Sequence, residues 1–206
     1  NYKDISLVGS MPEYVNKLPI DTLATGSPMT TVDFLAHIGY VTCEKTLEHP
    51  AVQELIASDE KFDLVVTELF NTDCLLGYVY KLNVPNIAIT TSIMMPWAHG
   101  RFGNPDNPSY LGNHFLPHAT QMTFSERLVN VIYEEGLKLY YHYMFDKPAY
   151  ELAKKYFGES LPPLSEIAKN TSLLLTNSHF TLNRPRPLTP NIIEVGGLHL
   201  NPSKDE

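Results

Sequence analysis

The stretch FDLVVTELFNTDC (residues 62–74) decides the fold of this chain. Its apolar run LVV predicts a strand that is covered on both faces, because buried strands of parallel sheets are continuously apolar. The strand runs into a polar cluster that contains Glu68 and Asp73. In open α/β sheets, ligands bind just outside the carboxyl ends of the strands. The two acids therefore have two alternative roles, either in chemistry at this edge or as caps of the next helix.

The segments that follow indicate a parallel sheet. A helix is expected over residues 73–82, and the apolar IAITT (residues 87–91) predicts a second strand. Strand, helix and strand within about thirty residues are typical of a parallel βαβ unit with a right-handed crossover. Later apolar runs predict two more strands. We expect parallel strands in one sheet at residues 64–67, 87–90, 173–176 and 192–195, which makes the chain one α/β domain with a Rossmann-like parallel sheet and flanking helices.

Helical segments surround these strands. Residues 29–46 place apolar side chains at helical spacing, with Thr31 and Asp33 as candidate start signals. A short helix is predicted within residues 49–59, with a proline in its first turn. TFSE (residues 123–126) is a capping box that opens a helical region through residue 145. A further helix is expected to end at Gly158, since glycine is a common helix stop.

Composition excludes several classes of protein. The 206 residues include 15 Lys and Arg against 23 Asp and Glu, giving a net charge of -8. The bases are scattered, which argues against a nucleic-acid partner. Cys43 and Cys74 do not fit a metal-ligand spacing, so we expect no metal site; a bridge between them stays open, since sequence cannot supply its geometry. The chain has no signal peptide at its start and no run of about 20 apolar residues that would span a membrane.

A long segment without regular periodicity covers residues 92–121. Loops of this length inside a compact domain are usually functional or disordered, and this one is too apolar for disorder. Its aromatic and methionine side chains either pack beneath the loop or line a ligand pocket, to which both types are suited. His99 and His114 are its two histidines that could lie near a ligand. The candidate pocket residues are Ile93, Met94, Met95, Trp97, Tyr110 and Phe115.

Several segments together resemble a known family. They are FDLVVTELFNTDC (residues 62–74), PSYLGNHFLPHATQMTFSERL (residues 108–128), YFGESLPPLSEIAKNTS (residues 156–172) and SLLLTNSHFTLNRPRPLTPNIIEVGGLH (residues 172–199). In this order they resemble the N-terminal domain of UDP-glycosyltransferases, most closely the insect branch. The resemblance covers nearly the whole chain, and PRPLTPNIIEVGG is its most specific part.

The resemblance implies a fold and an activity. UDP-glycosyltransferases have two Rossmann-type domains that face a cleft, the GT-B arrangement. The N-terminal half binds a small lipophilic acceptor and the C-terminal half binds most of the UDP-sugar, which is a co-substrate, so no cofactor is expected. A histidine just after the first strand deprotonates the acceptor hydroxyl, and a carboxylate beyond a later strand orients that histidine. The acceptor oxygen then displaces UDP, and a hexose or hexuronic acid is transferred with inversion.

The resemblance also assigns roles to parts of this chain. Residues 1–196 correspond to the acceptor-binding domain without its first strand, and residues 197–206 to the start of the interdomain linker. Glu68 falls where the family places the supporting carboxylate, and Asp73 is the alternative, although it could instead interact with the helix dipole. The catalytic histidine and the donor domain are expected outside the chain, so the chain alone should be inactive.

The family's location adds two expectations and leaves one alternative. The family is lumenal in the endoplasmic reticulum and is anchored by a single C-terminal span, here expected outside the chain. A lumenal location makes the sequon at Asn170 a credible glycosylation site. The alternative function is a non-catalytic carrier that holds small hydrophobic ligands without turnover. A parent reading frame that lacks the histidine or the donor domain would favour the carrier.

Overall fold

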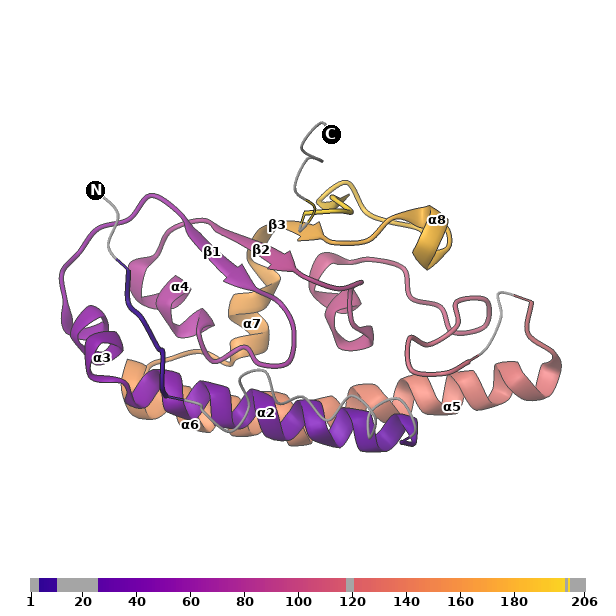
Figure 1. The fold of residues 1–206 in the computed structure, drawn as a ribbon, viewed down its shortest axis with the longest axis horizontal. Coiled ribbons are helices and arrows are strands. Elements are labelled where there is room, and N and C mark those ends of the chain that lie inside the picture. Colours follow the sequence, from indigo (N-terminus) through magenta and orange to yellow (C-terminus); the bar gives the residue numbers. More distant parts are fainter. Residues whose placement is uncertain (1–3, 11–25, 118–120, 199, 201–206) are drawn as a thin grey trace, which may run out of the picture.

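The sheet is parallel throughout, as predicted. The computed structural model describes residues 4–10, 26–117, 121–198 and 200. Its four strands follow one another in the order β1-β2-β3-β4, and every neighbouring pair is parallel (Figure 1). This arrangement confirms the α/β fold class. The strands are β1 (Val65–Glu68), β2 (Asn86–Thr90), β3 (Thr171–Thr176) and β4 (Ile192–Glu194).

The first crossover is the predicted βαβ unit. Helix α4 (Leu76–Leu82) connects β1 to β2 and ends at Asn83, which adopts a left-handed conformation with φ 49°. Asparagine tolerates this conformation better than most residues, so it can end a helix where glycine is absent. The pairing register sets Glu68 beside Ile89. The last residue of β1 is therefore at the carboxyl edge of the sheet.

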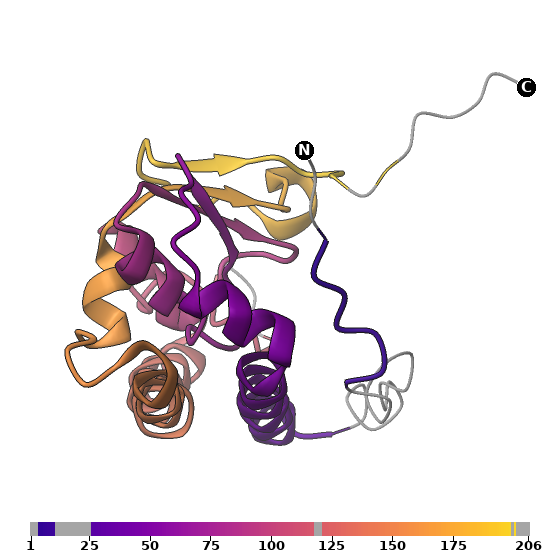
Figure 2. The ribbon, with the colours of Figure 1, turned by 90° about the vertical axis from the view of Figure 1, so that its left-hand side faces the viewer.

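The remaining helices lie mainly on one side of the sheet. Two layers are visible: α4, α7 and the 3₁₀ helix η1 lie next to the strands, while α2 and the α5–α6 rod run side by side beneath them (Figures 1 and 2). A π-helical turn, η2, joins α5 to α6. The bounds are α2 (Pro28–Glu48), α3 (Pro50–Ala57), η1 (Pro96–Phe102), α5 (Phe124–Tyr141), η2 (His142–Asp146), α6 (Lys147–Phe157), α7 (Leu164–Lys169) and α8 (Phe180–Asn183).

Helix ends follow the local sequence signals closely. The capping box is confirmed, because Thr123 and Glu126 exchange hydrogen bonds at the start of α5. Gly158 ends α6 with φ 95°, a conformation that L side chains rarely adopt. Helix α2 begins earlier than expected, since the side chain of Ser27 caps it, rather than Thr31 or Asp33. The predicted start at residue 29 is within one residue of the observed start, but the predicted cap residues are wrong.

A disulfide joins the two cysteines whose pairing the sequence left open. Cys43 in α2 and Cys74 before α4 are bridged, with their Cα atoms 6.1 Å apart. Both side chains are buried in a core formed by α2, α3, α4, α6 and α7. A second core lies between the sheet, η1 and α5 and includes Trp97, Leu137 and Tyr141. The bridge thus ties the loop after β1 to the long helix α2.

Candidate active site

Glu68 stands at the carboxyl edge of the sheet, where the sequence predicted a site. It is the last residue of the edge strand β1, and its side chain is exposed. Within the described residues its hydrogen-bond partner is Thr91, whose Oγ1 donates to Oε1 at 3.3 Å. A carboxylate held this lightly keeps oxygen lone pairs for a further donor. The geometry therefore leaves Glu68 able to bind another group.

Asp73 lies five residues further along the chain and is almost completely buried, with an exposed fraction of 5%. Its carboxylate accepts hydrogen bonds from both Nη atoms of Arg101, one of them at 2.7 Å. The hydroxyl of Tyr141 donates to the same carboxylate at 2.7 Å. Helix α4 has no side-chain cap, so the capping role expected for Asp73 is wrong. The carboxylate bonds to Arg101 of η1 and Tyr141 of α5 rather than to the backbone at the start of α4.

The Asp73–Arg101–Tyr141 cluster is a closed, charge-balanced unit. Burial alone lowers the pKa of Arg101, but Asp73 and Tyr141 outweigh burial and raise it overall, so the guanidinium stays charged. Burial raises the pKa of Tyr141 well above its usual value, and Asp73 raises it further, so the phenol stays protonated. Bidentate Arg–carboxylate pairs of this kind are strong and directional. The three side chains are thus bonded to one another, since Arg101 also donates to the Tyr141 hydroxyl, and the cluster holds the loop after β1 against η1 and α5.

A mainly apolar cavity of about 390 Å³ adjoins both acids. It runs along β1 between α2, α3 and α4, and its lining includes Phe62, Leu64, Val66, Glu68 and Asp73. Pockets of a few hundred Å³ with apolar walls and few polar groups are typical of small-molecule sites. The exposed carboxylate of Glu68 is thus combined with a space that suits a lipophilic ligand.

From the loop after β2, Arg101 and Phe102 line that cavity, but none of the six predicted acceptor residues does. Met94, Met95 and Trp97 are buried in the core between the sheet and α5. The Trp97 ring stacks on Tyr141 at a centroid distance of 4.7 Å, and its Nε1 donates to the carbonyl of Phe70. These three side chains pack in the core, as in the first of the two alternatives. Contact between them and an acceptor stays a prediction.

The other three loop residues lie apart from one another. Phe115 packs on Trp97, with ring centroids 6.2 Å apart. Tyr110 is half exposed, and Ile93 lines a separate, smaller cavity of about 180 Å³. The six predicted acceptor residues thus do not form one pocket wall, and their assignment to acceptor binding likewise stays a prediction.

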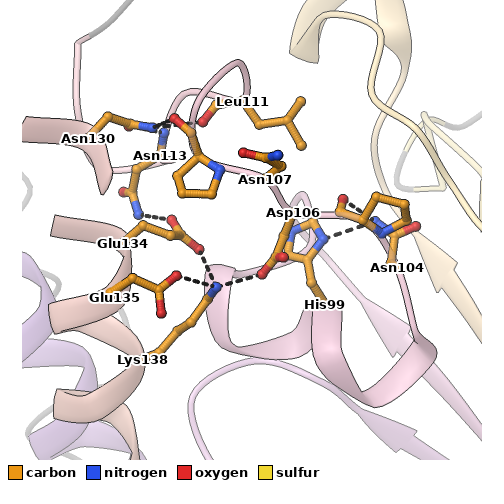
Figure 3. Close-up of polar contacts among 12 residues, drawn as sticks. His99, Asn104, Asp106, Asn107, Leu111, Asn113, Asn130, Glu134, Glu135 and Lys138 are labelled. Atoms are coloured by element: carbon orange, nitrogen blue, oxygen red, sulfur yellow. Dashed lines mark hydrogen bonds and ion pairs between the residues drawn. The ribbon is translucent and has the colours of Figure 1, made fainter. Parts of the chain in front are cut away.

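Buried polar side chains hold the long loop against α5 (Figure 3). Asn130 accepts a hydrogen bond from the backbone N–H of Asn113 at 2.7 Å and donates to the carbonyls of Pro108 and Leu111. The side chain of Asn113 donates to Glu134 at 2.6 Å. Buried polar groups are costly unless they are paired, so each of these bonds favours one loop conformation. The loop is fixed by its polar residues rather than by regular structure.

Charged groups complete the same network. Lys138 contacts Asp106 of the loop at 2.7 Å and Glu135 at 3.1 Å, and Glu134 lies at 3.7 Å (Figure 3). His99 Nδ1 accepts a hydrogen bond from Nδ2 of Asn104 at 2.9 Å. Burial, together with Arg186 and Lys138, lowers the pKa of His99 to about 4 against the opposing effect of Asp106. His99 is thus neutral at pH 7 and is poorly matched to work as a general base.

The predicted glycosylation site lies on the surface. Asn170 is exposed between α7 and β3, at the end of the sheet opposite Glu68. Its side chain is accessible, and glycosylation there stays a prediction.

In the described part of the chain no three His, Cys, Asp or Glu side chains gather closely enough to hold a metal ion. None of the described helices is both long and apolar enough to cross a bilayer.

Sequence reasoning missed Arg101 and Tyr141 as partners of Asp73. Tyr141 packs in the core and its hydroxyl donates to Asp73, a contact that the local sequence does not indicate. The available signal was a lone arginine within the apolar and aromatic segment MMPWAHGRF (residues 94–102). A cation in such a segment requires a buried anion, because an unpaired buried charge is strongly unfavourable. His179 accepts a local hydrogen bond from the N–H of Thr181.

The fold and site define a parallel α/β domain with a ligand cavity beside the carboxyl edge of its sheet. Comparison with known proteins gives the family. The family described as "UDP-glucoronosyl and UDP-glucosyl transferase" matches residues 11–206. The chain therefore belongs to this UDP-glycosyltransferase family. No solved structure gives a significant match to the chain.

Individual relatives come from insects and vertebrates. UDP-glucosyltransferase 2 of Dactylopius coccus is 33% identical over 97% of this chain and 39% of its own length. UDP-glycosyltransferase UGT5 of the same insect is 40% identical over 72% of the chain and 28% of its own length. UDP-glucuronosyltransferase 3A1 of Xenopus laevis is 29% identical over 79% of the chain. The chain thus spans less than half of the length of each of these relatives.

Proposed function

We propose that this chain is the acceptor-binding part of a longer, GT-B-type glycosyltransferase. The transferase would move a hexose or hexuronic acid from a UDP-sugar to a hydroxyl of a small lipophilic acceptor, with inversion. Family membership supports the transfer from a UDP-sugar. The apolar cavity of about 390 Å³ beside Glu68 supports the lipophilic acceptor, and this pairing of cavity and carboxylate is the observation that carries the proposal.

Glu68 has the position and freedom that its proposed role requires. An alcohol is a poor nucleophile at neutral pH, so its proton must be taken by a base as it attacks. The acceptor oxygen forms a bond to the anomeric carbon, UDP leaves with the electrons of the broken bond, and the proton passes to a histidine. Glu68 would hold that histidine in the productive tautomer and stabilise its charged form. Asp73 is already paired, so it is the weaker candidate.

The histidine itself would come from sequence outside residues 1–206, together with the domain that binds the donor. We therefore propose that the isolated chain is inactive. Loss of a general base costs about a hundred- to ten-thousand-fold in rate.

A lumenal location is part of the same proposal. Disulfides persist in oxidising compartments and are rare in the cytosol. The buried bridge between Cys43 and Cys74 and the exposed sequon at Asn170 both support folding in the endoplasmic reticulum. Attachment to the membrane would use a span outside the chain.

Two measurements test the proposal: sugar transfer by the full-length protein and acceptor binding by this chain. The full-length protein is assayed for UDP release with UDP-glucose and UDP-glucuronic acid and a panel of phenols and steroids. Val66→Asp, which places a charge in the cavity wall, should raise KM for apolar acceptors, while an exposed control, Glu151→Gln on α6, should leave it unchanged. Acceptor binding without any UDP release would instead support the carrier function. Unaltered KM in Val66→Asp would remove the cavity from the proposal.

A further inference from the structure

A second cavity, of about 180 Å³, lies between the long loop and the segment after β3. Its walls include Ile93, Gly112 and His114 from the loop, and Arg184 and Arg186 from the segment that leads to β4. Both segments follow carboxyl ends of strands, since Ile93 comes soon after β2 and the arginines come after β3. The cavity thus lies on the ligand-binding side of the sheet, and its walls differ from those of the cavity beside Glu68.

The two arginines of this cavity lack a carboxylate partner. Within the described residues, neither Arg184 nor Arg186 forms an ion pair, whereas Arg101 is fully paired. Arg186 donates from Nη2 to the carbonyl of Gly112 at 3.0 Å, which occupies one of its five N–H groups. The nearest acid that influences it is Glu134, and that carboxylate is already bonded to Asn113.

Like charges therefore meet at this cavity. Burial lowers the pKa of Arg186, and the neighbouring Arg184 lowers it further against the effect of Glu134. Burial also lowers the pKa of His114, and Arg186 lowers it further. The chain as a whole is acidic, with a net charge of -8, whereas this cavity carries two arginines that form no ion pair within the described residues. Arg184 is exposed and Arg186 is partly buried, so an anion between them would relieve their repulsion and the lost hydration of Arg186.

The backbone at Arg184 provides independent support. Arg184 has φ 65° and ψ 152°, a region that is populated almost only by glycine. The residue that follows is proline, and residues before proline prefer extended conformations with negative φ. Such backbone strain is unfavourable and is concentrated at ligand sites. The strained backbone holds the side chain of Arg184 at the cavity.

We propose that the cavity between residues 111–116 and 182–186 binds an anionic oxygen group, a phosphate or a carboxylate, through Arg184 and Arg186. Guanidinium groups suit both ligands, because their planar N–H pairs match the spacing of two oxygens. The group could belong to a nucleotide-sugar or to an acidic acceptor. The binding does not depend on glycosyl transfer, so it can fail or succeed independently of the proposed function.

The test is calorimetric titration of the 206-residue chain with pyrophosphate and, separately, with benzoate. At least one of the two should bind at physiological ionic strength, and uridine and benzyl alcohol should not compete. Tighter binding of pyrophosphate would indicate a phosphate ligand, and tighter binding of benzoate a carboxylate. If neither anion binds, the proposal is overturned.

Variants separate this site from general attraction of anions. Arg184→Gln and Arg186→Gln should each weaken binding at least tenfold, and Arg186→Lys should retain part of it. The matched control is Arg127→Gln on α5, an exposed arginine away from the cavity, which should bind as the parent does. Equal affinity in the Arg184→Gln/Arg186→Gln double variant and the parent would overturn the proposal.

The strain at Arg184 gives a second readout that does not use the ligand. Arg184→Gly should raise the Tm by about 2 to 4 °C, since about 1 kcal/mol of strain is relieved in a chain of this size. The same variant should lose anion binding as Arg184→Gln does. Higher stability together with lost binding is the signature of strain retained for a ligand. A glycine variant that binds the anion as tightly as the parent would contradict the assigned role of Arg184.

Discussion

Glu68 and Asp73 are five residues apart and of the same charge, but the structure places them in opposite environments. Glu68 is exposed at the end of β1 and has a hydroxyl as its described partner. Asp73 is buried and shares three hydrogen bonds with Arg101 and Tyr141. One carboxylate is available for chemistry, whereas the other is committed to structure.

The difference shows why residue type alone does not identify a site. A buried carboxylate with a matched cation offers the solvent and any substrate very little, however close it lies to a cavity. An exposed carboxylate at a strand end has hydrogen-bonding capacity left over. Substitutions should therefore separate the two regions, with stability responding to Asp73 and turnover responding to Glu68.

Replacement of Asp73 should have the largest effect. Asp73→Asn leaves the guanidinium of Arg101 buried without its counter-charge, and breaking a buried pair costs about 3 to 5 kcal/mol. Urea denaturation should show this loss in the free energy of unfolding. The control is the double variant Asp73→Leu/Arg101→Met, which removes both charges and should recover much of the stability. Equal stability of Asp73→Asn and the parent would show that the pair does not hold the fold.

Loss of the disulfide should have the next largest effect. Like the replacement of Asp73, it tests stability rather than turnover. The bridge closes a loop between Cys43 and Cys74 with a sequence separation of 31, which corresponds to about 3 to 4 kcal/mol in the chain-entropy description. Cys43→Ser/Cys74→Ser should lower the free energy of unfolding by this order. Reduction of the parent with dithiothreitol should lower its Tm, and the serine variant should not respond to reductant. A parent that is insensitive to reductant after full thiol titration would contradict the role of the bridge.

Glu68→Gln should change catalysis rather than the fold. The amide keeps the size of the side chain and one acceptor oxygen but removes the charge that would stabilise an imidazolium. Turnover by the full-length protein should fall about a hundredfold or more, within the range of acid–base assistance. The free energy of unfolding should stay within about 0.5 kcal/mol, as for most surface changes. Glu151→Gln serves as the exposed control, and retained turnover in Glu68→Gln would return the supporting role to Asp73.

The smallest effect concerns the alkaline stability of the buried cluster. The pKa of Tyr141 is raised in the folded protein by burial and by Asp73, so the folded state holds its proton after the unfolded state has lost it. Its contribution is complete below pH 10 and declines as the pH rises above that value, by at most about 1.4 kcal/mol per pH unit. Tyr141→Phe should therefore have a flatter decline of the free energy of unfolding between pH 10 and 12. At pH 7 it should cost about 1 kcal/mol for the lost hydrogen bonds.

The parallel sheet and several helix ends were predictable because local patterns encode them. Apolar runs marked all four strands, and the capping box marked the start of α5. Glu68 was also predictable, since the end of a parallel strand lies at the carboxyl edge. The prediction that this strand is covered on both faces is wrong for the described residues, because β1 is the edge strand and Val66 is 54% exposed. The π-turn between α5 and α6 was not predicted, because the helical region was expected to end at residue 145, whereas the helix continues through η2 into α6.

Two features of the site depended on contacts between distant segments. Asp73 and Tyr141 are 68 residues apart, and Asn113 meets Asn130 across 17 residues. The apolar residues of the loop look the same in the sequence whether they line a pocket or pack in the core. In the structure Trp97 packs against Tyr141 and Phe145, a contact between segments that are far apart in the sequence.

The sequence by itself determined the fold class, the family and the position of one free carboxylate, because strand periodicity, helix capping and family motifs are local properties. The tertiary structure decided which acid is neutralised, where the cavities lie and that Arg184 and Arg186 share one of them. The physical reason is that charge pairing and burial depend on which segments meet in space. A carboxylate becomes structural or available according to the cation and the solvent around it, and neither is written in its neighbours along the chain.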